Sequence, residues 1–337
     1  MRAIVLTKNL KKIKSANYQY EFIDWLGKKF EIYKYGIGYD KYNSKDDFNE
    51  IVEKSSFGNK VDIVLFAHTW LNDDPNYQNI SIHKNLNIKK DIPKIGFLNK
   101  EYVNLKEKLK FYKENNFDLI LTHNHNFKDY ENLTGKNFLF SPFASDNKIY
   151  FPKKKKGIDL MFSGIITPNY RHEFSDTRIK MQKKIFEDYN FFKIKKKEYK
   201  NFNIYWNNNL LLKNIIRDRF ERLFRDSRLS YANKLSNSKL VFNTLSPSQL
   251  INPRFFESLS SGAIPICPET SAFKSIAGMD NVVIKTNKNL DDIHEKLSFY
   301  SNNLIEFNKL SEKAIKFSKN NTWEKRIESL INKIKTL

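Results

Sequence analysis

Arg254 and Glu257 lie three positions apart near the C-terminus, and together they could bind a phosphorylated ligand. This spacing is close to one helical turn, so the two side chains would be neighbours on one helix. An arginine could form charge-assisted hydrogen bonds with phosphate oxygens, while a carboxylate could accept hydrogen bonds from a ribose diol. An ordinary i,i+3 pair on an exposed helix is the plainer interpretation of the same two residues.

The surrounding sequence predicts a helix that would place both residues beside a sheet. From Leu240 it runs LVFNTLSPSQLINPRFFESLSSGAIPICPE, which predicts a strand, an irregular loop, a short helix over 253–260 and a second strand. Pro253 suits the first helical turn, where its missing N–H is not needed, and Gly262 suits the C-terminal stop. The helix would present its N–H groups and positive dipole end at the carboxyl edge of the sheet. A diphosphate would be stabilised there.

Histidines directly follow two of the predicted strands. His68 comes after VDIVLFA, and His123 and His125 come after FDLILT. Sites in α/β proteins form at the carboxyl ends of strands, and the ordinary pKa of histidine suits a general base. We take His68 as the candidate base for an acceptor hydroxyl, with a structural or exposed histidine as the alternative. His172, next to Arg171, could instead reach a phosphate.

No metal and no other cofactor is expected. Asp73 and Asp74 lie in a polar stretch, and Asp291 and Asp292 begin a predicted helix, so no Asp-x-Asp motif stands beside a strand. The single cysteine, Cys267, excludes an internal disulfide and a cysteine-based zinc site, and it fits a reducing cytosolic setting.

The elements around these residues predict an α/β chain with two cores. A length of 337 residues exceeds the usual limit of a single core, and short apolar runs alternate with amphipathic stretches. The predicted strands are 2–7, 61–67, 94–98, 117–122, 158–164, 203–206, 240–244, 263–266 and 282–284. The predicted helices include 20–30, 105–115 and 178–200, with residues 304–337 helical throughout. A lysine-rich segment ending at Gly157 predicts a linker.

These features resemble group-1 type GT-B glycosyltransferases, nearest to the spore-maturation CgeB-like branch. The resemblance covers roughly residues 137–337 and includes a Pro-Phe-Ala-x-Asp turn at 142–146. Its central motif here is Asn252, Arg254, Phe256, Glu257, Ser261, Gly262 and the run 263–265. The resemblance implies two Rossmann-like domains facing each other across a cleft: an acceptor domain at 1–150 and a donor domain at 151–315. A C-terminal helix at 316–337 would cross back to the first domain.

The same resemblance implies a metal-independent hexosyltransferase that uses a nucleotide-sugar donor. The implied donor-binding residues are Gly164, Arg171, Gln249, Asn252, Arg254, Phe255 and Glu257, with Glu257 on the ribose. Retaining relatives often carry a Glu-x7-Glu motif, and its first position holds Gln249 here. The anomeric outcome is therefore open, and a scaffold that binds without catalysis is an alternative. The α-1,3-fucosyltransferases and exostosin-like transferases share a similar Glu-to-Gly-to-Pro stretch and are alternatives at the family level.

The net charge of +21 favours anionic partners. The expected reaction moves a sugar from a UDP- or GDP-sugar to a glycan, glycolipid or other polymer. The alternative is a basic nucleic-acid-binding protein or a DNA-modifying glycosyltransferase, although no helix-turn-helix, zinc or RNP-type motif is present. No apolar stretch reaches the roughly 20 residues of a membrane-spanning helix. We expect a cytoplasmic protein, with peripheral contact at an anionic inner membrane surface as an open alternative.

Overall fold

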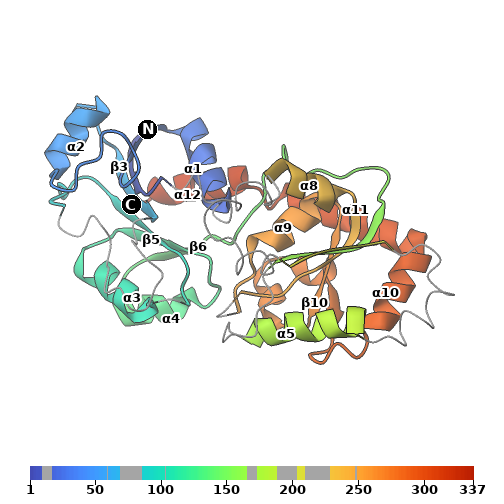
Figure 1. The fold of residues 1–337 in the computed structure, drawn as a ribbon. Helices are drawn as coiled ribbons and strands as arrows, with labels where there is room; N and C mark the ends of the chain where they lie inside the picture. The colour runs from blue at the N-terminus through green and yellow to red at the C-terminus, as the bar shows by residue number, and fades with distance from the viewer. Residues whose placement is uncertain are drawn as a thin grey trace, which may run out of the picture. The chain divides into compact units, whose positions relative to one another are not determined.

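A computed structural model describes residues 1–9, 17–58, 60–68, 86–102, 104–164, 173–187, 203–208, 228–246 and 249–337. The chain forms two compact units, Met1–Phe143 with Trp323–Leu337, and Ala144–Thr322. Each unit contains one sheet in which every strand pair is parallel (Figure 1). The two sheets confirm the expected α/β class with two Rossmann-like domains.

The first unit is built on a six-stranded sheet of order β2-β1-β3-β4-β5-β6. Its strands are β1 (Arg2–Thr7), β2 (Glu31–Tyr35), β3 (Ile63–His68), β4 (Lys94–Leu98), β5 (Leu119–Thr122) and β6 (Phe138–Phe140). Its helices are α1 (Asn17–Lys29), α2 (Phe48–Ser55), α3 (Leu105–Glu114), α4 (Phe127–Thr134) and α12 (Trp323–Ile334). The chain leaves β1 on one side to form β2 and returns on the other to form β3. This reversal is a topological switch point, where open α/β sheets bind ligands.

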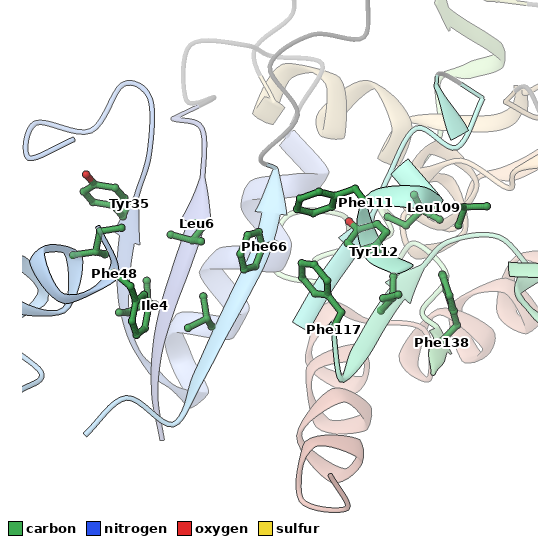
Figure 2. Close-up of a cluster of buried hydrophobic side chains, with 14 of the residues drawn as sticks. Ile4, Leu6, Tyr35, Phe48, Phe66, Leu109, Phe111, Tyr112, Phe117 and Phe138 are labelled. Carbon is green, nitrogen blue, oxygen red and sulfur yellow. The ribbon is translucent and has the colours of Figure 1, made fainter. Parts of the chain in front are cut away.

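The core of the first unit explains why its central strands are continuous apolar runs. Figure 2 shows Ile4 and Leu6 of β1 and Phe66 of β3 among buried aromatic rings. The ring of Phe66 meets that of Phe117 edge-on, with centroids 4.9 Å apart. Strands covered on both faces need apolar residues at successive positions, which is the pattern in β1, β3 and β5.

The last helix, α12, belongs to the first unit and packs against α1 (Figure 1). Trp323 is fully buried, and its ring lies edge-on to Phe22 of α1 at 6.0 Å. Arg326 donates from Nε to the carbonyl of Pro142 at 3.0 Å. Helix α12 therefore completes the core of the first unit, which residues 1–143 otherwise form.

The expectation of one continuous helix from 304 to the end was wrong. Helix α11 (Leu304–Lys319) stops three residues before α12 begins. The amide Nδ2 of Asn321 donates to the carbonyl of Phe317 at 2.9 Å, and Thr322 forms an isolated parallel bridge with Ser145. Asparagine side chains compete with the backbone for such hydrogen bonds, so the helical ladder ends here.

The second unit repeats the strand order of the first. Its sheet runs β11-β10-β9-β7-β8, so β7 lies between β8 and β9 as β1 lies between β2 and β3. The strands are β7 (Ile158–Gly164), β8 (Ile204–Asn208), β9 (Ser238–Phe242), β10 (Ile264–Pro268) and β11 (Ile284–Thr286). The helices are α5 (Glu173–Gln182), η2 (Lys183–Glu187), α8 (Arg228–Ser236), α9 (Pro253–Ser260), η4 (Ser271–Ser275), η5 (Met279–Asn281), α10 (Ile293–Asn302) and α11. The second switch point lies at the carboxyl ends of β7 and β9.

Candidate functional site

Asn252 anchors the predicted helix to the switch point of the second sheet. It is the N-cap of α9, and its Oδ1 accepts a hydrogen bond from the backbone N–H of Arg254 at 3.1 Å. Its Nδ2 donates to the carbonyl of Thr244, just beyond β9, at 2.7 Å. Pro253 occupies the first helical turn as expected. Both ends of one buried amide thus fix where α9 begins relative to the sheet.

The first backbone N–H groups of α9 are engaged within the protein. Pro253 has none, that of Arg254 is bound by the Asn252 side chain, and that of Phe255 donates to the Asn252 carbonyl at 3.2 Å. The expectation that this helix offers its first N–H groups to a ligand is therefore wrong. The helix dipole and the side chains remain as the means of attracting an anion.

Gly164 and Arg254, both expected at the donor site, lie together. A Cβ placed on Gly164 would come within 3.0 Å of Nη1 of Arg254. The absence of a side chain at the end of β7 thus lets the guanidinium group lie close to the backbone. Arg254 is half-buried, while the helix that carries it is well packed.

Arg178 of α5 supplies a second cation, which the sequence analysis did not single out. Its Nε donates to the hydroxyl of Thr244 at 2.9 Å. Burial and the neighbouring charge of Arg254 lower the pKa of Arg178 to about 10. A bound anion such as a diphosphate would reduce the unfavourable interaction between these two positive charges. Arginine is much scarcer than lysine in this chain, which was the one available hint.

Glu257 is buried, so it is not half of an exposed surface pair with Arg254. Only 7% of its surface is exposed, and its Oε1 accepts a hydrogen bond from the hydroxyl of Tyr150 at 3.2 Å. A second hydrogen bond comes from the hydroxyl of Tyr231 in α8. Burial raises the pKa of Glu257, while the charges of Arg254 and Arg228 and the two tyrosine hydrogen bonds oppose that rise.

Two further expected donor residues differ in exposure. Gln249 is exposed and has a left-handed backbone, with φ of 57°, and its Oε1 accepts a hydrogen bond from the Thr270 hydroxyl at 3.2 Å. Phe255 is fully buried and meets Phe273 edge-on at 5.5 Å. Its side chain supports α9 from the core. Arg171 and His172 lie outside the described residues.

The candidate base His68 is the last residue of β3, and it lies at the switch point of the first sheet. Its backbone is in register with Thr7 at the end of β1. The side chain of His68 is outside the described part of the structure. His125 is half-buried, and burial lowers its pKa.

His123 directly follows β5 and is buried. Its Nδ1 lies 2.6 Å from the carbonyl oxygen of Ser141, and its ring stacks on Phe143 with centroids 3.5 Å apart. Burial lowers the pKa of His123 to about 3, so the ring is neutral at physiological pH. These contacts describe a packed histidine.

Among the described residues, no three His, Cys, Asp or Glu side chains come together as metal ligands would. Asp292 precedes α10 as its N-cap residue, as expected, and Asp291 pairs with Lys184 at 2.7 Å. Asp73 and Asp74 lie outside the described residues. Within the part that the structure describes, no helix is long and apolar enough to cross a membrane.

The C-terminal part of the chain matches a known protein family. Residues 193–332 match the family model described as "Glycosyl transferase-like", and this range includes Tyr231, Arg254 and Glu257. No curated protein matches the sequence significantly. The nucleic-acid alternative receives no support from these comparisons.

Solved structures resemble this chain over its whole length. HepE from Anabaena, solved with UDP and glucose, is 8% identical, with 100% of each chain covered and a TM-score of 0.62. A glycosyltransferase from Rickettsia africae ESF-5 is 10% identical, with 99% of this chain and 98% of that chain covered and a TM-score of 0.62. Sucrose-phosphate synthase from Thermosynechococcus elongatus is 8% identical, with 100% and 98% covered and a TM-score of 0.61. At these identities the likeness concerns the fold, and it confirms the expected GT-B architecture.

Proposed function

We propose that this protein is a glycosyltransferase that moves a hexosyl group from a UDP- or GDP-sugar to a glycan, glycolipid or other polymer. The observation that carries the proposal is the buried carboxylate of Glu257 beside the guanidinium groups at one switch point of the second sheet. The family match over residues 193–332 supports it, because that range contains Arg254 and Glu257. HepE, which shares the fold, binds UDP and glucose. The CgeB-like branch is the subgroup that we propose.

The two guanidinium groups would bind the diphosphate of the donor. Arg254 and Arg178 lie close enough for the charge of one to lower the pKa of the other. An anionic diphosphate would relieve this repulsion and accept charge-assisted hydrogen bonds. The same groups would stabilise the charge that develops on the leaving nucleotide as the glycosidic bond breaks. Because two protein cations meet that charge, we propose a reaction that does not depend on a metal ion.

Glu257 would bind the ribose of the same donor. A carboxylate accepts hydrogen bonds only, and a ribose diol has two hydroxyl groups to donate. The residue lies one turn after Arg254 on α9, so one helix would contact both ribose and phosphate. Asn252 and Gly164 would serve this arrangement by fixing the start of α9 and leaving room for the Arg254 side chain. We keep Arg171 and Gln249 as further donor-site proposals, and we propose that Phe255 serves the donor site by supporting α9 from the core.

The acceptor would bind at the first sheet, with His68 as general base. Its position at the end of β3, in register with Thr7, places it at the switch point of that sheet. A neutral imidazole there could accept the proton of an acceptor hydroxyl. We place the reaction in the cytoplasm, where the net charge of +21 would favour an acceptor at an anionic membrane surface.

A thermal-shift panel of UDP, GDP, ADP and CMP tests the proposal. One nucleoside diphosphate at a hundredfold excess over its Kd should stabilise the protein by about 2.7 kcal/mol, or roughly 5 °C in Tm. Glu257→Gln, which keeps the buried volume, should lose most of this shift. Glu312→Gln, at an exposed position of α11, is the matched control and should keep it. Salt-sensitive retention on nucleic acid with no nucleotide shift would sink the proposal.

A further inference from the structure

Glu257 holds a buried carboxylate whose hydrogen-bonding capacity is only partly used. An ionised carboxylate can accept about four hydrogen bonds. From the described part of the chain, the side chain receives one from Tyr150 and one from Tyr231, while Arg254 and Arg228 contribute charge nearby. With these two donors, about two acceptor positions would remain, which matches the two hydroxyl groups of a cis-diol.

The two tyrosines that bind Glu257 come from different elements and are themselves held in place. Tyr150 is 1% exposed, and its backbone carbonyl accepts a hydrogen bond from the Ser260 hydroxyl at 2.7 Å. Ser260 lies on α9 with Glu257, so Tyr150 is tied to that helix at two points. Tyr231 comes from α8, and its ring meets that of Tyr150 edge-on, with centroids 6.5 Å apart. The carboxylate is thus oriented from two sides by rigid groups.

Tyrosine hydroxyls suit this task because they are neutral donors. A lysine or arginine in direct contact would form an ion pair and occupy more of the carboxylate. The phenols give one hydrogen bond each and leave the negative charge for another partner. Arg228 of α8 contributes charge near Glu257 and also pairs with Asp146, with Nη2 and Oδ2 3.9 Å apart.

We propose that Tyr150 and Tyr231 are positioning residues that orient the Glu257 carboxylate for a ribose diol, and thereby make this site select ribonucleotides over 2′-deoxyribonucleotides. The inference rests on the proposed function, since it assigns a ligand group to the same carboxylate. It adds that selectivity depends on two residues that need not touch the ligand. Tyr150 and Tyr231 act through Glu257, by fixing where its free acceptor positions point.

Calorimetric titration of UDP, GDP and ADP, each beside its 2′-deoxy counterpart, tests this role in the full-length protein. The wild type should prefer the ribonucleotide by roughly tenfold, the effect of one hydrogen bond to a charged group. Tyr150→Phe and Tyr231→Phe should each weaken ribonucleotide binding roughly 3- to 10-fold. The affinity for the 2′-deoxy counterpart should change by less than about twofold, which is below the smallest usual effect of losing a hydrogen bond. Selectivity, and not affinity alone, is therefore the measured quantity.

Tyr205→Phe is the matched control. Tyr205 packs in the same cluster, but its hydroxyl accepts from Lys234 at 2.6 Å. This variant should keep the wild-type preference. The hydrogen bonds from Tyr150 and Tyr231 favour the ionised form of Glu257. Their loss in the Tyr→Phe variants should therefore raise the pKa of Glu257 and move the acid limb of the plot of nucleotide affinity against pH to higher pH. A purely structural role would leave that limb in place.

Three outcomes would overturn the inference. Equal weakening of both nucleotides by Tyr150→Phe or Tyr231→Phe would mean that the tyrosines only support the fold. Unchanged binding in both variants would mean that Glu257 needs no such orientation. A wild type that binds no nucleoside diphosphate would overturn the proposed function as well, so the two failures are distinguishable.

Discussion

The indole Nε1 of Trp323 donates a 2.7 Å hydrogen bond to the carboxylate of Glu21, 302 positions away in the sequence. Both side chains are buried, with exposures of 0% and 2%. The bond joins α12 to α1 inside the first unit. A buried carboxylate that loses a donor retains the full cost of its desolvation, so breaking this bond should destabilise the packing of α12 against α1.

Trp323→Phe should therefore destabilise the first unit by about 2–4 kcal/mol, from the lost hydrogen bond and the smaller ring. Urea denaturation would measure the loss, and hydrogen exchange should locate it in α1 and α12. Glu21→Gln keeps an acceptor oxygen for the indole and should cost less. An unfolding free energy of Trp323→Phe within about 0.5 kcal/mol of the wild type would contradict this account, because that is the usual range of a neutral surface substitution.

A side chain at Gly262 should destabilise the second unit. Its φ of 64° is left-handed, and an added Cβ would lie 3.0 Å from Oγ of Ser311 and 3.1 Å from Cβ of Pro152. Gly262→Ala should therefore cost about 1 kcal/mol for the backbone and about 1–2 kcal/mol more for the crowding. Gly278→Ala is the control in the same unit, because its φ of 82° is also left-handed and its nearest neighbour, Phe317, is 3.7 Å away. Equal losses of unfolding free energy in the two variants would show that crowding contributes nothing.

Local sequence preferences were enough to predict α9 and most central strands. Asn252 and Pro253 define the start of α9 through contacts within a few residues, and α9 spans the expected 253–260. Central strands such as β1 and β7 are buried on both faces, so they stand out as apolar runs. The edge strand β2 contains charged residues, and it was not predicted.

Contacts between distant residues were out of reach. Tyr150 lies 107 positions from Glu257, and no local pattern indicates that its hydroxyl binds that carboxylate. Arg178 appeared only as the start of a charged helix, because its proximity to Arg254 depends on where α5 lies relative to Thr244 and α9 in the folded unit. The sequence thus identified the helix that carries the site, while the groups around its carboxylate required the tertiary structure.

His123 should make the first unit sensitive to acid. Its pKa is lowered to about 3 by burial, against 6.5 in the unfolded chain. Between these values the unfolded state binds more protons, so this stabilising contribution is complete above pH 6.5 and is lost as pH falls toward 3. The slope should approach 1.4 kcal/mol per pH unit, or about 2–3 kcal/mol between pH 6.5 and 4.

The His123 prediction is measured as a difference between the wild type and His123→Gln, whose side chain does not titrate. The carboxylates titrate in both proteins, so their contributions to the pH dependence of the unfolding free energy cancel in that difference. The unfolding free energy of the wild type should fall faster with acidity than that of the variant. Parallel curves from pH 6.5 to 4 would mean that His123 is protonated in the folded state.

Arg178→Gln should weaken nucleotide binding much more than it changes the stability of the free protein. In the absence of ligand, Arg178 is close enough to Arg254 for that charge to lower its pKa. Removing one cation relieves the repulsion, which offsets the lost hydrogen bond to Thr244, so the unfolding free energy should stay within about 1 kcal/mol of the wild type. If the two arginines bind a diphosphate, the variant should bind UDP about 10- to 100-fold more weakly, the effect of losing a charge-assisted hydrogen bond.

The phosphate dependence of Arg178→Gln separates a ligand contact from a general loss of positive charge. UMP lacks the second phosphate, so its affinity should change much less than that of UDP. Lys180→Gln removes a charge from an exposed position of the same helix and should leave the UDP to UMP ratio unchanged. If Arg178 only stabilises the fold, its replacement would lower the unfolding free energy and leave the UDP to UMP affinity ratio unchanged. If Arg178 binds the second phosphate, its replacement must change this ratio, because UMP lacks the group that the guanidinium would contact.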